Sequence, residues 1–105
     1  MAINRANILR IIEDIAEEWE RQGYSVKANL DGWSRPNKIE GLVPDLRATR
    51  GDKIIIGKIE TDNGLESNRA LLEVFKNYAE DNDNASFRLY LLSEDGSCTL
   101  HKIFS

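Results

Sequence analysis

The sequence predicts a single α/β domain in which the elements follow the order helix, three strands, helix, two strands. Two observations predict it. Apolar residues recur at helical spacing in two segments, and five other segments are rich in β-branched and aromatic residues and are bounded by turn-forming residues. The chain of 105 residues has the size of one domain with one core, so residues 1–105 are treated as one unit.

Helices are expected at residues 4–22 and 66–80. In the first segment Gly23 supplies a stop signal. Its apolar positions are Ile8, Ile11, Ile12, Ile15, Ala16 and Trp19. Those of the second segment are Ala70, Leu71, Val74, Phe75 and Tyr78. Both sets place one apolar face toward a core.

Strands are expected at residues 24–30, 42–49, 53–61, 86–93 and 98–105. The second and third are joined by the tight turn Arg50, Gly51 and Asp52, and the last two by residues 94–97. The uninterrupted run 54–56 of isoleucines is typical of a central strand that is covered on both faces. Residues 31–41 and 62–66 are expected to be loops.

Composition describes an ordinary globular protein, with 41% hydrophobic and 30% charged residues. No run approaches the roughly 18 apolar residues that span a bilayer, and residues 1–10 lack the layout of a signal peptide. A cytoplasmic protein that does not enter membranes is therefore expected. Cys98 is the only cysteine, which excludes an internal disulfide, and it is expected to be a small, half-buried strand residue.

The formal net charge of -4 argues against a protein that coats nucleic acid by bulk attraction, but it permits a local basic patch. Basic residues gather between residues 35 and 53. Trp33, Arg35, Lys38 and Arg47 are the candidate nucleic-acid contacts, because an aromatic ring and nearby cations can stack on and steer a strand. Trp33 can equally fold back over the core.

The second and third strands bring a lysine and two acids together. Lys58 and Glu60 alternate with Ile59 and so point to one face, about 7 Å apart along the strand. If the hairpin turns at residues 50–52, Asp45 lies across from them. Two carboxylates can hold Mg²⁺, and a nearby lysine can orient a water or offset charge in a phosphoryl transition state. The same three residues can equally form a plain ion-pair cluster.

The Pro44-Asp45 pair, the turn, the hydrophobic strand and the closely spaced acid and lysine resemble the PD-(D/E)XK, or restriction-endonuclease-like, nuclease superfamily. The resemblance covers nearly the whole chain and implies a mixed central β-sheet flanked by two helices. It also implies a Mg²⁺- or Mn²⁺-dependent DNA endonuclease or resolvase-like phosphodiesterase. In that comparison Asp45 and Glu60 are the metal ligands, Lys58 is the water-orienting group, and Glu13 or Glu17 is an auxiliary acid from the first helix.

The second motif departs from the family pattern, since the family has acid, any residue, lysine and this chain has Lys58, Ile59 and Glu60. Two hypotheses follow. The chain is a metal-dependent nuclease, or it is a catalytically degenerate nuclease-fold module that binds nucleic acid or a protein partner, with the ammonium of Lys58 in the place of the cation. Glu13 and Glu17 can also be no more than the polar flank of an amphipathic helix. A domain this small offers little surface to grip a duplex, so a homodimer or a protein partner is expected.

Overall fold

The computed structural model describes residues 5–105 and contains three helices and five strands in that range. The elements are α1 (Arg5–Arg21), β1 (Ser25–Ala28), β2 (Leu46–Arg50), β3 (Lys53–Glu60), α2 (Asp62–Ser67), α3 (Arg69–Asp81), β4 (Ala85–Leu92) and β5 (Cys98–Phe104). Each predicted strand is present, within a few residues of its expected bounds. Asn4, the expected first residue of the first helix, lies outside the described residues.

The five strands form one mixed sheet in the order β1-β2-β3-β4-β5. Neighbouring strands are antiparallel except β3 and β4, which are parallel and are joined by the crossover through α2 and α3. The isoleucine-rich β3 is therefore the central strand, as its sequence predicts. The parallel pair requires a crossover connection, which explains why the second helical segment lies between these two strands.

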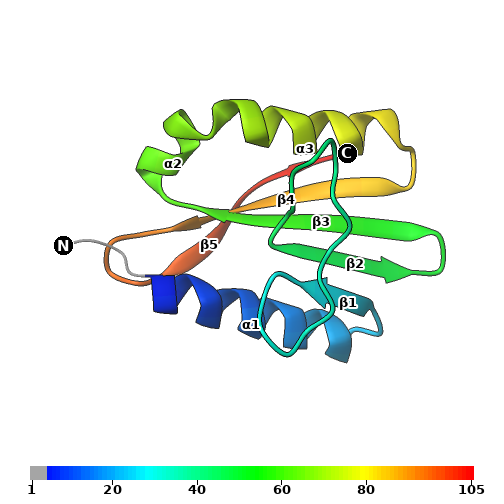
Figure 1. The fold of residues 1–105 in the computed structure, drawn as a ribbon, viewed down its shortest axis with the longest axis horizontal. Helices are drawn as coiled ribbons and strands as arrows, with labels where there is room; N and C mark the ends of the chain where they lie inside the picture. Colours follow the sequence, from blue (N-terminus) through cyan, green and yellow to red (C-terminus); the bar gives the residue numbers. More distant parts are fainter. Residues whose placement is uncertain (1–4) are drawn as a thin grey trace.

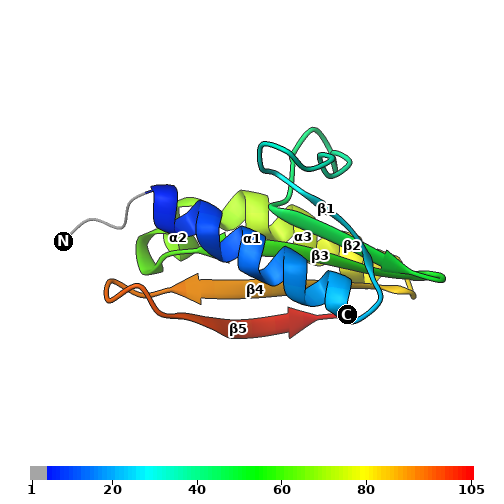
Figure 2. The same cartoon turned by 90° about the horizontal axis from the view of Figure 1, so that it is seen from below.

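Helices cover both faces of the sheet, with α1 on one side and α2 and α3 on the other (Figure 1). Successive side chains of β3 enter different cores: Ile55 and Ile59 pack with Ala16 and Trp19 of α1, whereas Ile56 packs with Phe75 of α3. This alternation is the period of two that a strand imposes. Figure 2 looks onto the α1 side and shows β5 at the edge of the sheet, beyond α1.

The first helix confirms its predicted pattern. Ile11, Ile12, Ala16 and Trp19 are its buried residues, and they form one stripe toward the sheet. The helix ends before Gly23, which has φ 92°. Such a left-handed conformation is the usual helix stop and is easily adopted by glycine. No helix in the described part of the chain is long and apolar enough to cross a membrane.

The prediction of only two helices was wrong, because residues 62–67 form the short helix α2 rather than a loop. Thr61 is its N-cap, and the side-chain oxygen of Thr61 accepts a hydrogen bond of 3.0 Å from the backbone N–H of Gly64. The cap satisfies one of the amide groups that the first turn of a helix leaves without a partner. Asn68 ends α2 and begins α3, so the second helical segment is divided at that residue.

The hairpin of β2 and β3 turns where the sequence predicts. Arg50 pairs with Lys53, and Gly51 between them has φ 61°. The ladder continues from this turn to the pair Leu46 and Gly57. β2 begins four residues later than predicted, beyond Pro44, which has no N–H to donate to a ladder.

Candidate functional site

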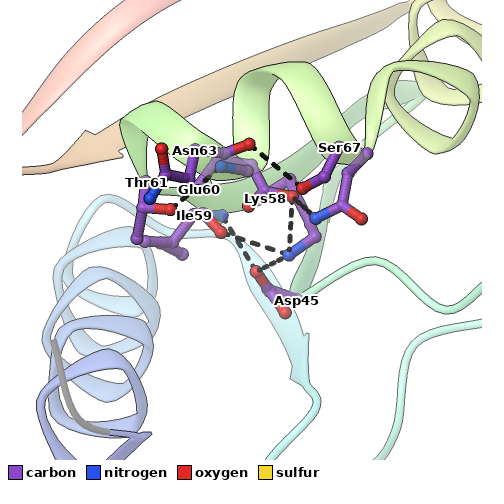
Figure 3. A network of polar contacts seen from close by, with 9 residues as sticks. Asp45, Lys58, Ile59, Glu60, Thr61, Asn63 and Ser67 are labelled. Carbon is purple, nitrogen blue, oxygen red and sulfur yellow. Dashed lines mark hydrogen bonds and ion pairs between the residues drawn. The ribbon is translucent and has the colours of Figure 1, made fainter. Parts of the chain in front are cut away.

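The hairpin brings Asp45, Lys58 and Glu60 together, as the sequence predicts (Figure 3). The paired ladder ends at Leu46 and Gly57, and Asp45 and Lys58 are the next residues beyond that pair, away from the turn. The N–H of Asp45 still donates to the carbonyl of Gly57 at 3.0 Å. Asp45 itself precedes β2, but this backbone hydrogen bond to the central strand β3 anchors the cluster to the sheet.

One oxygen of Asp45 holds two partners. Its Oδ2 accepts the backbone N–H of Ile59 at 2.9 Å and the ammonium of Lys58 at 3.2 Å. The carboxylate thus accepts the N–H of Ile59, which lies beyond the end of the β2–β3 ladder and so has no backbone acceptor in β2. A buried amide without a partner is costly, so this contact stabilises the end of the hairpin as well as the cluster.

The ammonium of Lys58 lies among three oxygens. Besides Oδ2 of Asp45, its Nζ is 3.1 Å from the carbonyl of Ile59, to which it donates, and 3.6 Å from Oε2 of Glu60. The exposed fractions of the three side chains are only 17% for Lys58, 13% for Asp45 and 7% for Glu60. Pairs this well shielded from water are screened less than surface ion pairs, and the loss of one partner leaves the other charge desolvated.

Glu60 is the buried end of the cluster, and the helix pair α2 and α3 encloses it. Its Oε2 accepts a hydrogen bond of 2.8 Å from Nδ2 of Asn68. Its Oε1 lies against Gly64, where a Cβ atom would collide with it. The missing side chain of Gly64 therefore makes room for the carboxylate of Glu60, and the side-chain amide of Asn68 donates a hydrogen bond to that carboxylate.

The acids predicted on the first helix do not join this cluster. Glu13 and Glu17 are both exposed, and α1 packs on the face of the sheet opposite to Lys58 and Glu60. Glu13 instead lines a hollow of about 420 Å³, together with Arg5, Arg10 and Arg35. Both glutamates therefore fit the interpretation that they form the polar flank of the amphipathic helix α1.

The four predicted nucleic-acid contacts are divided between the two faces. Trp33 is half-buried against the α1-side core, and Arg35 pairs with Asp31 at 3.0 Å. On the other side of the sheet, Nη1 of Arg47 lies 3.4 Å from the hydroxyl of Tyr78 in α3. Lys38 is exposed in the loop between β1 and β2. The structure therefore does not gather these residues into one patch.

Sequence reasoning missed Lys27, which lies beside Arg47. The two residues are paired across β1 and β2, and Nζ of Lys27 donates to Oδ1 of Asn37 at 3.1 Å. They line a hollow of about 180 Å³ with Ser25, Asn37 and Thr49. Alternation along residues 24–30 indicated a strand, but it gave no information on which strand lies next to it.

The residues of the cluster do not fit a divalent cation in this arrangement. Mg²⁺ needs oxygen ligands at about 2.0 to 2.1 Å in an octahedron, whereas here an ammonium lies between the two carboxylates. Within residues 5–105, no group of three or more histidine, cysteine, aspartate or glutamate side chains is arranged to hold a metal ion.

Comparisons of the chain with protein-family models, with curated proteins and with solved structures find no match. The assignment of function therefore depends on the geometry described above.

Proposed function

We propose that this chain is a restriction-endonuclease-like domain that binds DNA through its phosphate backbone without a divalent metal ion. The observation that carries the proposal is the hollow on the α3 side of β1 and β2. Two cations, two hydroxyls and an amide line this hollow, and no carboxylate does.

The chemistry of the hollow suits a phosphate group. Lys27 and Arg47 supply positive charge, and the hydroxyls of Ser25 and Thr49 and the amide of Asn37 supply further hydrogen-bond donors. Among the described residues, neither Lys27 nor Arg47 forms an ion pair with a carboxylate. Their charges are therefore available to an external anion. Contacts of this kind position a protein on DNA without reading its sequence.

The carboxylate cluster lies near the hollow. Asp45 is two residues before Arg47, so alternation places both side chains on the same face of the sheet. A free pair of carboxylates at this point would repel the DNA backbone. Lys58 reduces that repulsion, because two carboxylates and one ammonium leave a formal charge of about -1. In this proposal Lys58 takes the role that a cation has in an active nuclease site.

DNA binding without metal can be tested by fluorescence anisotropy of a dye-labelled duplex in the presence of EDTA. We expect affinity to fall steeply with salt, because cation-to-phosphate contacts release counterions. Arg47→Gln and Lys27→Gln should each lower the slope of log K against log salt by about 1. Lys102→Gln, which removes a charge from β5 at the other edge of the sheet, is the matched control and should leave the slope unchanged. Equal slopes in all four proteins would overturn the proposal.

Metal-dependent hydrolysis is the second candidate, and one observation favours it. The carboxylates of Asp45 and Glu60 converge on a single ammonium, so they would face a common cation if Lys58 moved away. Calorimetric titration with Mn²⁺ of the parent and of Asp45→Asn separates the two candidates. Binding that is lost in the variant, followed by cleavage of linear, nicked or branched DNA, would establish the nuclease. Heat indistinguishable from dilution in both proteins supports the metal-free domain.

A homodimer or a protein partner stays a prediction. Sedimentation at equilibrium, with and without duplex DNA, measures it directly. A monomer that binds DNA with the salt dependence described above would show that the small domain needs no second copy.

A further inference from the structure

Another hollow lies between α3 and β5, on the same side of the sheet as the hollow at Lys27 and Arg47 but at the opposite edge of the sheet. Its volume is about 320 Å³. The apolar side chains that line it are Leu65, Leu72, Phe87, Leu89 and Phe104. Phe87 and Phe104 stack with ring centroids 5.6 Å apart, so the base of the hollow is a continuation of the α3-side core.

Positive charge surrounds this apolar base. Arg69 and Lys76 of α3 and Lys102 of β5 line the hollow with the imidazole of His101, whereas Glu73 is the one acid in the lining. The ammonium groups of Lys76 and Lys102 lie 5.7 Å and 5.4 Å from the centroid of the Phe104 ring. Two cations close to one aromatic ring give this edge a local positive potential in a protein whose net charge is -4.

The acids near these cations hold them weakly. Nζ of Lys76 is 4.0 Å from Glu73, and the guanidinium of Arg69 is 3.9 Å from Glu66. Both distances are at the limit of an ion pair, and exposed pairs of this kind contribute little. Lys102 forms no ion pair within the described part of the chain. The cations are therefore available to a charged ligand.

We infer that the hollow between α3 and β5 is a binding site for an amphipathic organic anion, a small molecule with an acidic group on an apolar body. The apolar body would lie on Phe104 and Leu72, and the acidic group would face Lys76 and Lys102. The volume is at the lower end of the range of small-molecule sites, which suits a compact alkyl or aromatic body. This site lies apart from the DNA-binding hollow and does not depend on the proposed function.

The test uses the fluorescent anion anilinonaphthalene sulfonate with the folded protein. We expect saturable binding that octanoate displaces and that octanol, the uncharged molecule of the same length, does not displace at the same concentration. Amide signals in a two-dimensional NMR spectrum should shift in α3 and β5. Shifts confined to other elements, or equal displacement by octanol and octanoate, would overturn the inference.

Variants of the two lysines test whether their charges hold the anion. Lys76→Gln should weaken binding about threefold and Lys102→Glu about tenfold, since each alters one surface ion pair with the ligand. Lys27→Gln removes a charge from the hollow at Lys27 and Arg47 and should leave the affinity for the anion unchanged. All three variants should unfold at the same temperature as the parent, which shows that they are folded. Unchanged affinity in both Lys76→Gln and Lys102→Glu would also overturn the inference. Lys27→Gln is the control for this ligand and Lys102→Gln is the control for DNA binding, so this inference and the DNA proposal can fail separately.

Discussion

The carboxylate of Asp45 accepts the ammonium of Lys58 at 3.2 Å and, through the same oxygen, the backbone N–H of Ile59 at 2.9 Å. One side chain therefore closes the hairpin ladder and neutralises the lysine. This relationship explains how an acid in a loop keeps a defined position: the amide that it accepts belongs to the central strand. Its loss should affect stability as well as any binding at the site.

Two substitutions of Asp45 separate these effects. Asp45→Asn keeps an acceptor oxygen for Ile59 but removes the charge, and should lower the free energy of unfolding by about 1 to 2 kcal/mol. Asp45→Ala leaves both the N–H and the ammonium without their partner, and should cost about 2 to 4 kcal/mol. Urea unfolding measures both. Equal costs would show that the contact with Ile59 contributes nothing.

Gly64 should not tolerate replacement by alanine, although it lies in the helix α2. Alanine in place of glycine normally stabilises a helix by about 0.5 to 1 kcal/mol. Here the added Cβ would collide with Oε1 of Glu60. That side chain is buried and held by Asn68, so it cannot easily move aside, and Gly64→Ala should instead destabilise the fold by about 1 to 3 kcal/mol. Thermal and urea unfolding both report the change.

A double-mutant cycle tests whether Glu60 is the cause. In the Glu60→Ala background the obstacle is absent, so adding Gly64→Ala should be neutral or stabilising. A cost that stays the same in both backgrounds would assign the effect to the helix backbone and would contradict the role of the glycine described here.

The sequence predicts the parts of the fold and site that depend on local pattern. Helical spacing locates α1, the isoleucine run identifies the central strand, and the turn at Gly51 predicts the hairpin that brings Asp45 to Lys58 and Glu60. These features need only the periods of helices and strands and one glycine with a positive φ. The cluster was predictable because two strands joined by a short turn have few possible registers.

Other parts depend on contacts between distant segments. α2 is short and contains Asn63 and Gly64, both weak helix formers, and its formation is supported by the cap from Thr61 and the packing on Glu60. The pairing of Lys27 with Arg47 depends on the register of β1 against β2, across a loop of seventeen residues (29 to 45). Local propensity cannot predict either feature.

Cys98 should behave as an unreactive thiol. Burial raises its pKa, which keeps the thiol protonated near neutral pH. The rate of alkylation by iodoacetamide should therefore rise only above pH about 8.5, the ordinary value for cysteine, and should be slower than in the urea-unfolded chain. The thiol ionises more readily in the unfolded chain. Its ionisation should therefore lower the free energy of unfolding as the pH rises above about 8.5. An inflection below the ordinary value would instead indicate an activated nucleophile.

Removal of the ammonium should create affinity for a divalent cation. In Lys58→Ala the carboxylates of Asp45 and Glu60 lose their shared cation, so the variant should be less stable by about 2 to 4 kcal/mol in EDTA. A cation that binds only the folded state stabilises it, by about 2.7 kcal/mol at a hundred times its Kd. Mn²⁺ should therefore raise the unfolding temperature of Lys58→Ala by more than that of the parent or of Lys27→Ala, the matched loss of a lysine elsewhere. An equal shift in all three proteins would mean that Lys58 does not stand in the place of a cation.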